Sequence, residues 1–429
     1  MSRLVHVVGA GLAGLAAAVQ LQRRGARVVL HEAAAQAGGR CRSFYDAKLG
    51  ATIDSGNHLI MSGNAATLNY LRAIGSADEL TGPALPEFPF VDLASRARWT
   101  VRMSPGRLPW WIFDPNMRVP NTGPSDYLSV APLLFAKPGR SVAQTMRSNG
   151  PLWDRLLAPL FRALLNVEPR EASAELTAAA VRETLISGGL ATRALVARHG
   201  LSSAFVDPAL RLLQHGGATI ELGSRLEQLV FAARQQANTR AMSSRVEALN
   251  FAAGSIALDR NHAVILAVSP DVAQTLVPGL RAPTRYAATV SVHFGIEPPF
   301  KLAPVTGLVN GTAQWLFAFD GRLAATVYGA QELIDTPAED LAARVWAEVA
   351  QAANLPAAAM PAYQVVIDRN ATFAALPDQE TLRPGTRTRW NNLMLAGDWT
   401  ATGLPATIEG AIRSGQKAAD TLLNQPMER

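Results

Sequence analysis

The amino-terminal segment joins a short apolar run, a glycine turn and a helix-forming stretch, and this order constrains the fold more than any other feature. The run Leu4–Val8 suits a buried parallel strand, and Leu12–Arg23 combines strong helix formers with apolar residues at helical spacing. The turn between them reads Gly9-Ala10-Gly11-Leu12-Ala13-Gly14. A strand, a glycine turn and a helix in this order predict a dinucleotide site in an α/β fold.

Each glycine has its own physical role in such a turn. Gly9 permits the tight turn, Gly11 lets the backbone approach a pyrophosphate, and Gly14 lets the helix pack closely on the strand. At the start of the helix, the N–H groups of Leu12 and Ala13 favour phosphate, together with the partial positive charge of the helix end.

An acid follows the second expected strand. That strand, Arg27–His31, should end beside Glu32, whose carboxylate can accept both hydroxyls of a ribose. An acid at this position argues against a 2′-phosphate on the nucleotide. The alternative that Met1–Ala18 is a signal peptide is disfavoured, because the glycines of the turn would break an apolar signal helix.

Length and composition bound the remaining choices. With 429 residues, 48% of them hydrophobic, the chain can form a large core, yet no apolar stretch approaches the roughly 18 residues of a spanning helix. The net charge of +6 suits anionic headgroups, and no basic run is interleaved with aromatics, which argues against nucleic-acid binding. Cys41 is the single cysteine, so an intramolecular disulfide is excluded, and the histidines show no metal-ligand spacing.

The pattern along the chain predicts an α/β protein with two interleaved domains. A Rossmann-type nucleotide-binding domain is expected from residues 1–82, 200–270 and 385–429. A substrate-binding domain of α+β type, with a helical cap, is expected from residues 83–199 and 271–384. A cluster of prolines marks the first crossing between them.

Coarse secondary structure follows from periodicity. The cap is predicted over Val142–Arg198, where leucines recur at helical spacing. Further strands are expected at Phe88–Leu93, Arg98–Met103, Gly217–Leu222, Leu226–Phe231, Val246–Phe251, Ser255–Leu258, Ala263–Val268, Thr289–Ile296, Gly307–Val309, Trp315–Phe319, Ala324–Tyr328 and Leu393–Ala396. Helices are expected at Ala65–Ile74, Pro337–Ala353 and Ala406–Leu423.

The two ends of the chain together resemble the flavin-containing amine oxidase and carotenoid desaturase superfamily. The amino-terminal signature is the glycine turn, Glu32 and Gly38-Gly39-Arg40, and the carboxyl-terminal one is the segment Leu395–Asp420. The resemblance implies FAD as cofactor and a glutathione-reductase-like nucleotide domain. It also implies that Asp398 lies near the flavin phosphate and ribitol, and that the helix start near Thr407 faces the isoalloxazine ring.

The expected FAD contacts combine both lines of reasoning. Guanidinium forks suit phosphate, so Arg40 and Arg42 are assigned to the cofactor, with a solvated ion-pair role as the alternative. The full set is Gly9, Gly11, Leu12, Ala13, Gly14, Glu32, Gly39, Arg40, Arg42, Gly56, Asn57, Leu226, Gly397, Asp398, Thr407 and Ile408.

Within the superfamily, three segments resemble the squalene-associated branch, the hydroxysqualene dehydroxylases. They are Asp54–Met61, Arg369–Ala374 and Gly397–Gly410. One departure from the amine oxidases supports this branch: their usual lysine near the flavin is absent from Thr289–Ile296, and the first lysine after it is Lys301. An apolar substrate therefore fits better than an amine.

The branch implies a reaction of squalene and hopanoid biosynthesis. Hydroxysqualene would lose its hydroxyl group as water and receive a hydride from the reduced flavin at an allylic carbon. Two alternatives remain: a phytoene-type desaturase that oxidises a long isoprenoid, and a lipid-binding flavoprotein without turnover.

Such a reaction needs an acid for the leaving oxygen. His58 is a candidate donor, Asp54 a candidate that orients it, and His293 a further candidate on a strand expected to line the flavin. Each also has a structural alternative, as a packed polar residue for the histidines and as a turn cap for Asp54.

Aromatic and basic residues suggest how a nearly insoluble substrate reaches the protein. Trp110–Phe113 and Val130–Ala136 are flanked by Arg107, Arg118 and Lys137, the composition of a membrane-interface patch. The sequence thus predicts a cytoplasmic protein in peripheral contact with lipid at the inner face of the membrane. Packing inside the substrate domain is the alternative.

Overall fold

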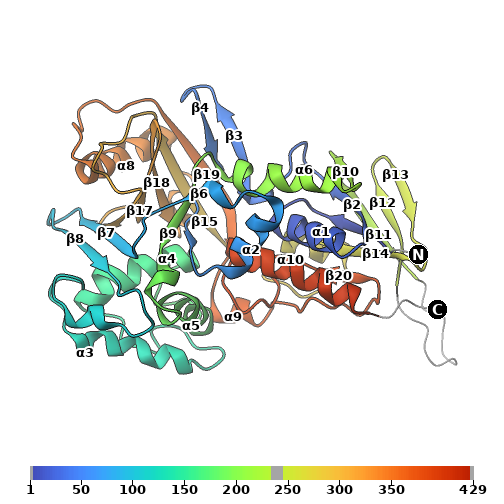
Figure 1. The fold of residues 1–429 in the computed structure, drawn as a ribbon, viewed down its shortest axis with the longest axis horizontal. Helices are drawn as coiled ribbons and strands as arrows, with labels where there is room; N and C mark the ends of the chain where they lie inside the picture. The colour runs from blue at the N-terminus through green and yellow to red at the C-terminus, as the bar shows by residue number, and fades with distance from the viewer. Residues whose placement is uncertain (1–2, 233–244, 426–429) are drawn as a thin grey trace.

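A computed structural model describes residues 3–232 and 245–425. The described chain forms two halves, each built on its own sheet (Figure 1). We call them the parallel half, around a five-stranded parallel sheet, and the mixed half, around a seven-stranded sheet that carries a helical cap. The chain passes between the halves several times, and both its first and its last strand belong to the parallel half.

The parallel half has a sheet in the order β10-β2-β1-β14-β20, with every neighbouring pair parallel. Its central strands are covered on both faces, which explains why they are continuous apolar runs. Its elements are β1 (Leu4–Val8), α1 (Leu12–Arg23), β2 (Arg27–Glu32), α2 (Ala65–Ile74), α6 (Asp207–His215), β10 (Thr219–Leu222), β14 (His262–Leu266), α7 (Pro270–Leu276), β20 (Leu393–Leu395) and α10 (Ile408–Leu423).

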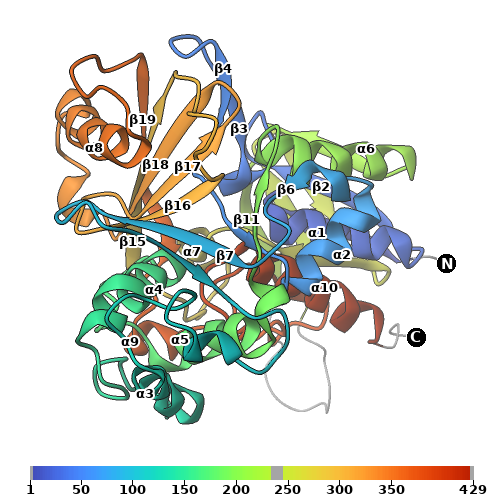
Figure 2. The ribbon, with the colours of Figure 1, turned by 60° about the vertical axis from the view of Figure 1, so that its left-hand side comes forward.

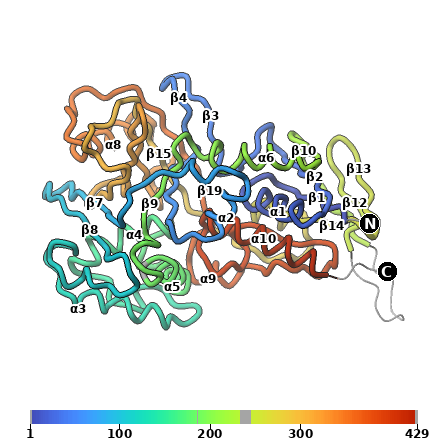
Figure 3. Tube along the Cα trace, viewed as in Figure 1, coloured from blue at the N-terminus to red at the C-terminus, as the bar shows by residue number. Residues whose placement is uncertain are grey.

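Helices α1 and α10 bring the two ends of the chain together. They lie side by side, blue and red in Figures 1 and 3. A Cβ on Gly415 of α10 would fall 2.0 Å from Ala13 O of α1, and Gln20 Nε2 donates to Asp420 Oδ1 at 2.9 Å. Because these pairs advance together along both helices, the helices run parallel and begin at the same edge of the sheet.

The mixed half has a sheet in the order β19-β15-β18-β17-β16-β7-β8, antiparallel except for the β16–β7 pair. Helix α8 packs against this sheet (Figure 2). Its elements are β7 (Glu87–Asp92), β8 (Arg98–Arg102), β15 (Tyr286–Phe294), β16 (Val305–Val309), β17 (Trp315–Phe319), β18 (Arg322–Tyr328), α8 (Ala338–Ala353) and β19 (Tyr363–Phe373).

Strand alternation gives this sheet two different faces. On β15, Val290, Val292 and Phe294 pack with the buried residues of α8 in one core. The residues between them, Ser291 and His293, belong to the opposite face, with the aromatic side chains of β17 whose core also contains the cap. That opposite face is the one that meets the parallel half.

The remaining elements connect the halves. A hairpin, β3 (Ser43–Asp46) with β4 (Ala51–Asp54), projects beside the mixed sheet (Figure 1), and small sheets join β5 (Ile60–Met61), β6 (Leu80–Thr81) and β9 (Ala194–Ala197), and β11 (Leu226–Phe231), β12 (Val246–Phe251) and β13 (Gly254–Ala257). The cap contains η3 (Trp110–Phe113), α3 (Pro124–Tyr127), η4 (Leu128–Phe135), η5 (Trp153–Leu157), α4 (Ala158–Leu165), α5 (Ala174–Val181), η6 (Arg182–Ile186) and η7 (Gly189–Thr192); η8 (Ser202–Val206) and α9 (Pro377–Glu380) complete the set.

Most expected elements are confirmed, and two expectations were wrong. The prediction of helix through Arg198 fails at its end, because the chain turns at Gly188, with φ of +103°, and Ala194–Ala197 then pairs with β5 and β6 as a strand. The aromatic run Trp110–Phe113 was expected as one patch, but Trp111 and Ile112 are buried in the core while Trp110 and Phe113 are exposed. Strand β19 was not recognised as a strand.

Candidate cofactor site

The glycine turn has the backbone geometry that its sequence predicts. Gly9 has φ of +102°, and a Cβ on Gly14 would lie 1.8 Å from Gly9 O, so neither position tolerates a side chain. Gly11 differs, because a Cβ there would meet nothing within 4 Å. It is the N-cap of α1, which has no side-chain cap, so the first N–H groups of α1, at Leu12 and Ala13, remain available to a ligand.

The second glycine turn lies directly against the first. Gly38 N donates to Ala10 O at 2.9 Å, and Gly38 pairs with Gly11 as an isolated parallel bridge. Gly39 approaches so closely that a Cβ there would lie 3.4 Å from Gly11 Cα. Glu32 is held beside both turns, because its carboxylate accepts from Ala10 N at 2.7 Å and from the backbone two residues beyond it at 2.9 Å.

Arg40 joins the two ends of the chain. Its guanidinium donates to both carboxylate oxygens of Asp398, at 2.8 and 2.7 Å, and to Ala371 O at 2.6 Å. The charge of Asp398 raises the pKa of Arg40, so the guanidinium is permanently protonated. The side chain remains 46% exposed and is therefore open to an anionic group as well as to Asp398.

The turn after β20 is held by Arg383, a residue that the sequence did not single out. Its side chain is fully buried and donates to Asp398 O at 3.0 Å, Trp399 O at 3.4 Å and Thr400 O at 2.5 Å. Among residues 3–232 and 245–425, no acceptor lies within hydrogen-bonding reach of the amide N–H groups of Asp398 and Trp399. No sequence signal distinguished Arg383 from the arginines around it.

Helix α10 begins beside this turn. Thr407 is its N-cap, and its hydroxyl oxygen accepts from Gly410 N at 3.0 Å, while Ile408 is the first helical residue. Glu409, in the first turn of α10, accepts from the backbone N–H groups that open α2, at 3.0 and 2.8 Å, and from Thr67 Oγ1 at 2.7 Å. Its carboxylate thus anchors α2 to α10.

Asn57 connects the parallel half to the mixed sheet. Its Nδ2 donates to Thr326 Oγ1 at 3.1 Å, and Ser291 Oγ lies 3.5 Å from the same hydroxyl. The other end of the amide, Asn57 Oδ1, is buried with no partner in the described chain. A buried acceptor of this kind costs free energy unless a ligand donates to it.

His58 follows Asn57 and is half-buried. Burial lowers its pKa to about 4, with a further contribution from the charge of Arg40. At neutral pH its imidazole is therefore uncharged and offers an N–H donor, not a full positive charge. The ring lies near Gly56, where a Cβ would be 3.8 Å from His58 Nε2.

His293 is fully buried on the inner face of the mixed sheet. Its Nδ1 lies 2.6 Å from Arg322 NH1 and must accept, so the proton of the neutral ring is on Nε2, which has no partner among the described residues. Burial lowers the pKa of His293 to about 3, and that of Arg322 to about 10. The sequence named His293 but missed Arg322.

Asp54 is occupied by structural contacts. Its Oδ1 accepts from Ser43 Oγ at 2.6 Å and from Leu201 N at 2.8 Å, which ties the β3–β4 hairpin to η8. Burial raises the pKa of its carboxyl group. These contacts favour the turn-anchoring alternative over a direct role beside His58.

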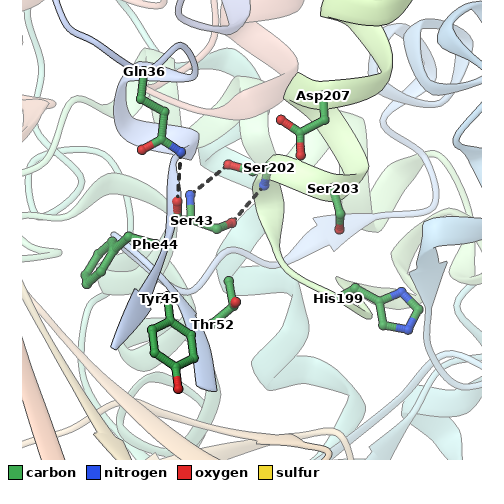
Figure 4. A pocket seen from close by; sticks show the side chains of 9 residues that line it. All are labelled: Gln36, Ser43, Phe44, Tyr45, Thr52, His199, Ser202, Ser203 and Asp207. Atoms are coloured by element: carbon green, nitrogen blue, oxygen red, sulfur yellow. Dashed lines mark hydrogen bonds between the residues drawn. The ribbon is translucent and has the colours of Figure 1, made fainter. Parts of the chain in front are cut away.

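A surface hollow of about 520 Å³ lies on the outer side of this hairpin (Figure 4). There Ser43 and Ser202 exchange two bonds, each N–H donating to the other hydroxyl oxygen at 2.8 Å. Its lining shares no residue with the Arg40–Asp398 pair. The hollow is therefore separate from the cofactor site.

The other expected contacts are less informative. Leu226 is buried at the start of β11, and Arg42 is exposed. Cys41 is buried, and its burial raises the pKa of the thiol to about 12, which makes it unreactive.

The donors that remain available suit a dinucleotide. They are the open start of α1, the Arg40 guanidinium, the two free amides of the turn after β20 and the start of α10, and they share one edge of the parallel sheet. Backbone N–H groups and a guanidinium bind pyrophosphate, and Gly11 leaves room for its close approach. The orphan Asn57 Oδ1 adds an acceptor for a ligand donor nearby.

Comparisons with solved structures identify the fold. A putrescine oxidase matches with a TM-score of 0.72 at 17% sequence identity, covering 99% of this chain and 100% of that one. A putative protoporphyrinogen oxidase from Exiguobacterium matches with a TM-score of 0.67 at 17% identity, covering 99% and 100% of the two chains. These matches establish the fold.

Sequence comparisons establish the family. Residues 12–423 match the family described as flavin containing amine oxidoreductase. The chain is 49% identical over 424 residues to a hydroxysqualene dehydroxylase of Rhodopseudomonas palustris, and 47% identical over 425 residues to that of Sinorhizobium fredii, in each case across 99% of both chains. It is 23% identical to a 15-cis-phytoene desaturase of Narcissus pseudonarcissus, covering 98% of this chain and 79% of that protein. This chain therefore belongs to the hydroxysqualene dehydroxylase family of flavin-dependent oxidoreductases.

Proposed function

We propose that this protein is an FAD-dependent enzyme that reduces hydroxysqualene to squalene in squalene and hopanoid biosynthesis. The observation that carries the proposal is full-length identity of 41–49% to three proteins named hydroxysqualene dehydroxylase. In the reaction the allylic carbon–oxygen bond breaks, the oxygen leaves as water after taking a proton, and a carbon–hydrogen bond forms. When bound as FADH2, the cofactor would supply the hydride and, in the overall balance, the proton that completes the water.

In this proposal, different residues of the cofactor site bind different parts of FAD. The start of α1 and Arg40 hold the pyrophosphate, and Glu32 accepts the ribose hydroxyls. Asp398 and the start of α10 hold the flavin end. Asn57 Oδ1, orphaned in the described chain, accepts from a donor of the bound flavin or substrate.

The inner face of the mixed sheet supplies an apolar setting for the isoprenoid. Trp315 and Phe317 on β17 and Ala324 on β18 lie in one core with the cap helices, next to the Asn57–Thr326 contact. An apolar, dry setting strengthens hydrogen bonds to the leaving oxygen and keeps out competing water. No lysine lies on β15, so the amine oxidase chemistry of this superfamily is disfavoured.

His58 is proposed to donate a hydrogen bond from its N–H to the oxygen of the leaving hydroxyl. Because its pKa is about 4, it acts as a neutral donor, and the reaction should not depend on an imidazolium. We expect His58→Ala to lower kcat by about tenfold to a hundredfold while FAD stays bound, and His58→Gln, which keeps an N–H donor, to recover part of it. Unchanged turnover in His58→Ala would remove this role.

The deciding experiment is product analysis. Purified protein with FAD and a chemical reductant should convert hydroxysqualene to squalene, and protein without reductant should not. The second candidate, a phytoene-type desaturase, is favoured only by matches at 22–23% identity. The desaturase candidate predicts that the protein needs oxidised FAD, not a reductant, and that it desaturates phytoene. Bound flavin that reacts with neither isoprenoid would instead favour a lipid-binding role.

We also propose that the protein works on the surface of an anionic membrane. Of the twelve large apolar side chains that are exposed in residues 3–232 and 245–425, seven belong to the cap region: Leu108, Trp110, Phe113, Leu128, Phe135, Ile186 and Leu190. No helix in that part of the chain is long and apolar enough to span a bilayer. Aromatic residues with a basic surround are typical of an interfacial surface.

Contacts within the cap hold these segments in one region. Leu190 N donates to Pro105 O at 3.1 Å, and Arg182 donates to Leu134 O, next to Phe135. The Trp110 and Phe113 rings lie 6.2 Å apart. The segments are therefore neighbours, with Arg107 and Lys137 in the same stretches.

Vesicle binding tests the proposal. The wild-type protein should bind phosphatidylglycerol-containing vesicles, bind phosphatidylcholine vesicles less, and lose binding at high salt. Replacing Trp110, Phe113 and Phe135 by serine should abolish binding. A matched control replaces Tyr45 and Phe300, which are equally exposed but outside the cap, and should bind as wild type. Equal loss in both variants would contradict the proposal.

A further inference from the structure

In the turn between β20 and α10, three backbone carbonyl groups point at the guanidinium of Arg383. Arg383 donates to the carbonyl oxygens of Asp398, Trp399 and Thr400, and also to Thr402 Oγ1 at 2.8 Å. These three residues are buried and lie outside any helix or strand, so their carbonyls need donors from another part of the chain. The guanidinium fork faces these acceptors from one side: Nε donates to Trp399 O, and the two hydrogens of NH2 are shared among Asp398 O, Thr400 O and Thr402 Oγ1.

Arg383 is itself held firmly. Its NH1 donates to Glu380 Oε2 at 2.7 Å, and its guanidinium carbon lies 4.8 Å from the centre of the Phe373 ring. Its side chain has no exposed surface. A buried arginine with a carboxylate, an aromatic face and backbone carbonyls around it has few rotamers available, so the turn is built on a rigid support.

The consequence appears on the other side of the turn. Because the Asp398 carbonyl is turned toward Arg383, the Trp399 N–H of the same peptide unit points the opposite way. The Asp398 N–H lies opposite Gly397 O, which accepts from Thr400 N at 3.1 Å within the turn. Within the described chain neither of these two amides donates to an acceptor. Both residues are almost completely buried. Buried N–H groups without acceptors are rare in proteins, and here they adjoin the Asp398 carboxylate that Arg40 holds.

We propose that Arg383 is a positioning residue for the flavin: it holds the 397–402 turn in the conformation that presents the two free amides and the Asp398 carboxylate to the bound cofactor. It does not itself contact the cofactor, since its side chain has no exposed surface and its guanidinium donates to the turn and to Glu380. The inference rests on FAD binding, one part of the proposed function, and not on the identity of the isoprenoid.

The test measures FAD affinity without any substrate. Arg383→Ala should bind FAD at least about tenfold more weakly than wild type, because the amides lose their preset direction. Arg383→Lys keeps the charge but not the fork and should be intermediate. Arg389→Ala is the matched control: this exposed arginine of the same segment lies 4.2 Å over the Trp390 ring and does not touch the turn, so its affinity should stay within about twofold of wild type.

Chemical rescue separates positioning from general damage. Guanidinium at millimolar concentration fits the space left in Arg383→Ala and should restore FAD affinity there, while leaving wild type and Arg389→Ala unchanged. Circular dichroism of the apoprotein checks that each variant is folded. If Arg383→Ala is unfolded, FAD affinity is compared between wild type and Arg383→Lys.

Two results would overturn the inference: wild-type FAD affinity in a folded Arg383 variant, or a loss of affinity that Arg389→Ala shares or that guanidinium does not reverse. Failure of wild-type protein to bind FAD would instead reject the cofactor part of the proposed function.

Discussion

The two turns that open α1 and α10 lie at the same edge of the sheet, yet they are stabilised in different ways. The amino-terminal turn consists of backbone alone, with Gly9 at positive φ and Gly14 in contact with Gly9 O. The carboxyl-terminal turn depends on side chains, chiefly Arg383 on its carbonyls and Arg40 on Asp398. Both leave N–H groups free for a ligand.

The difference shows that a turn can be stabilised by residues within it or by side chains from distant parts of the sequence. Glycines act where they stand in the chain, so a short motif suffices for the first turn. The second turn needs an arginine 15 residues before Asp398 and another near the start of the chain. Substitutions in the two turns should therefore have different consequences for folding and for ligand binding.

The largest effect should come from Gly14→Ala. The new Cβ would lie 1.8 Å from Gly9 O, a backbone atom that cannot move without opening the turn. We expect a loss of more than about 3 kcal/mol in the free energy of unfolding, measured by urea denaturation of the apoprotein. Wild-type stability in this variant would mean that α1 does not pack as described.

Gly11→Ala should separate binding from folding. A Cβ at this position meets nothing within 4 Å, so the apoprotein should unfold within about 0.5 kcal/mol of wild type. The same Cβ would occupy the space of the pyrophosphate, and FAD affinity should fall by about tenfold or more. Equal FAD binding by both proteins would place the cofactor elsewhere.

Acid should weaken the sheet under the amino-terminal turn. His6 on β1 and His31 on β2 are buried, with ring nitrogens 3.1 Å apart, and burial lowers the pKa of each to about 4 from the usual 6.5. Between these values the unfolded chain binds more protons than the folded one, so stability should fall as pH drops from 6.5 toward 4.

Thermal unfolding across this range measures the effect. His6→Val, which matches the neighbouring valines of β1, removes one of the titrating rings and should flatten the profile. An unchanged slope in His6→Val would assign the acid sensitivity to other groups.

The smallest effect should come from Thr407→Ala. Loss of the side-chain cap on α10 removes the bond to Gly410 N and should cost about 1 kcal/mol of stability, whereas Thr407→Ser should retain most of it. Helix α1 has no such cap to lose. Chemical denaturation of both variants measures the difference, and equal stability of Thr407→Ala and wild type would show that solvent or ligand replaces the cap.

Recognition from sequence succeeded where the information is local. The predicted bounds agree within a few residues for the first strand and helix and for the last strand and helix. The glycine turn joins β1 to α1, and Glu32 ends β2, as expected. It failed where pairing over long distances decides the outcome. Ala194–Ala197 became a strand because β5 and β6, more than a hundred residues earlier, offer it partners.

The candidate chemistry shows the same division. His293 could be named from its strand, but its tautomer depends on Arg322, which reaches it from the next strand of the sheet. Glu409 lies in the first turn of α10, but its partners on α2 lie far away in the chain. In the contiguous run Trp110–Phe113 of the cap, Trp111 and Ile112 are likewise buried, whereas Trp110 and Phe113 are exposed.

The sequence by itself determined the cofactor class and the family, because glycines at positive φ, close helix packing and a helix start act over a few residues. Only the tertiary structure decided which arginine supports the 397–402 turn, which imidazole nitrogen carries a proton and which aromatic residues face outward. These properties depend on burial and on partners brought together from distant segments. Their energies come from desolvation and hydrogen bonding in that setting, which no local pattern specifies.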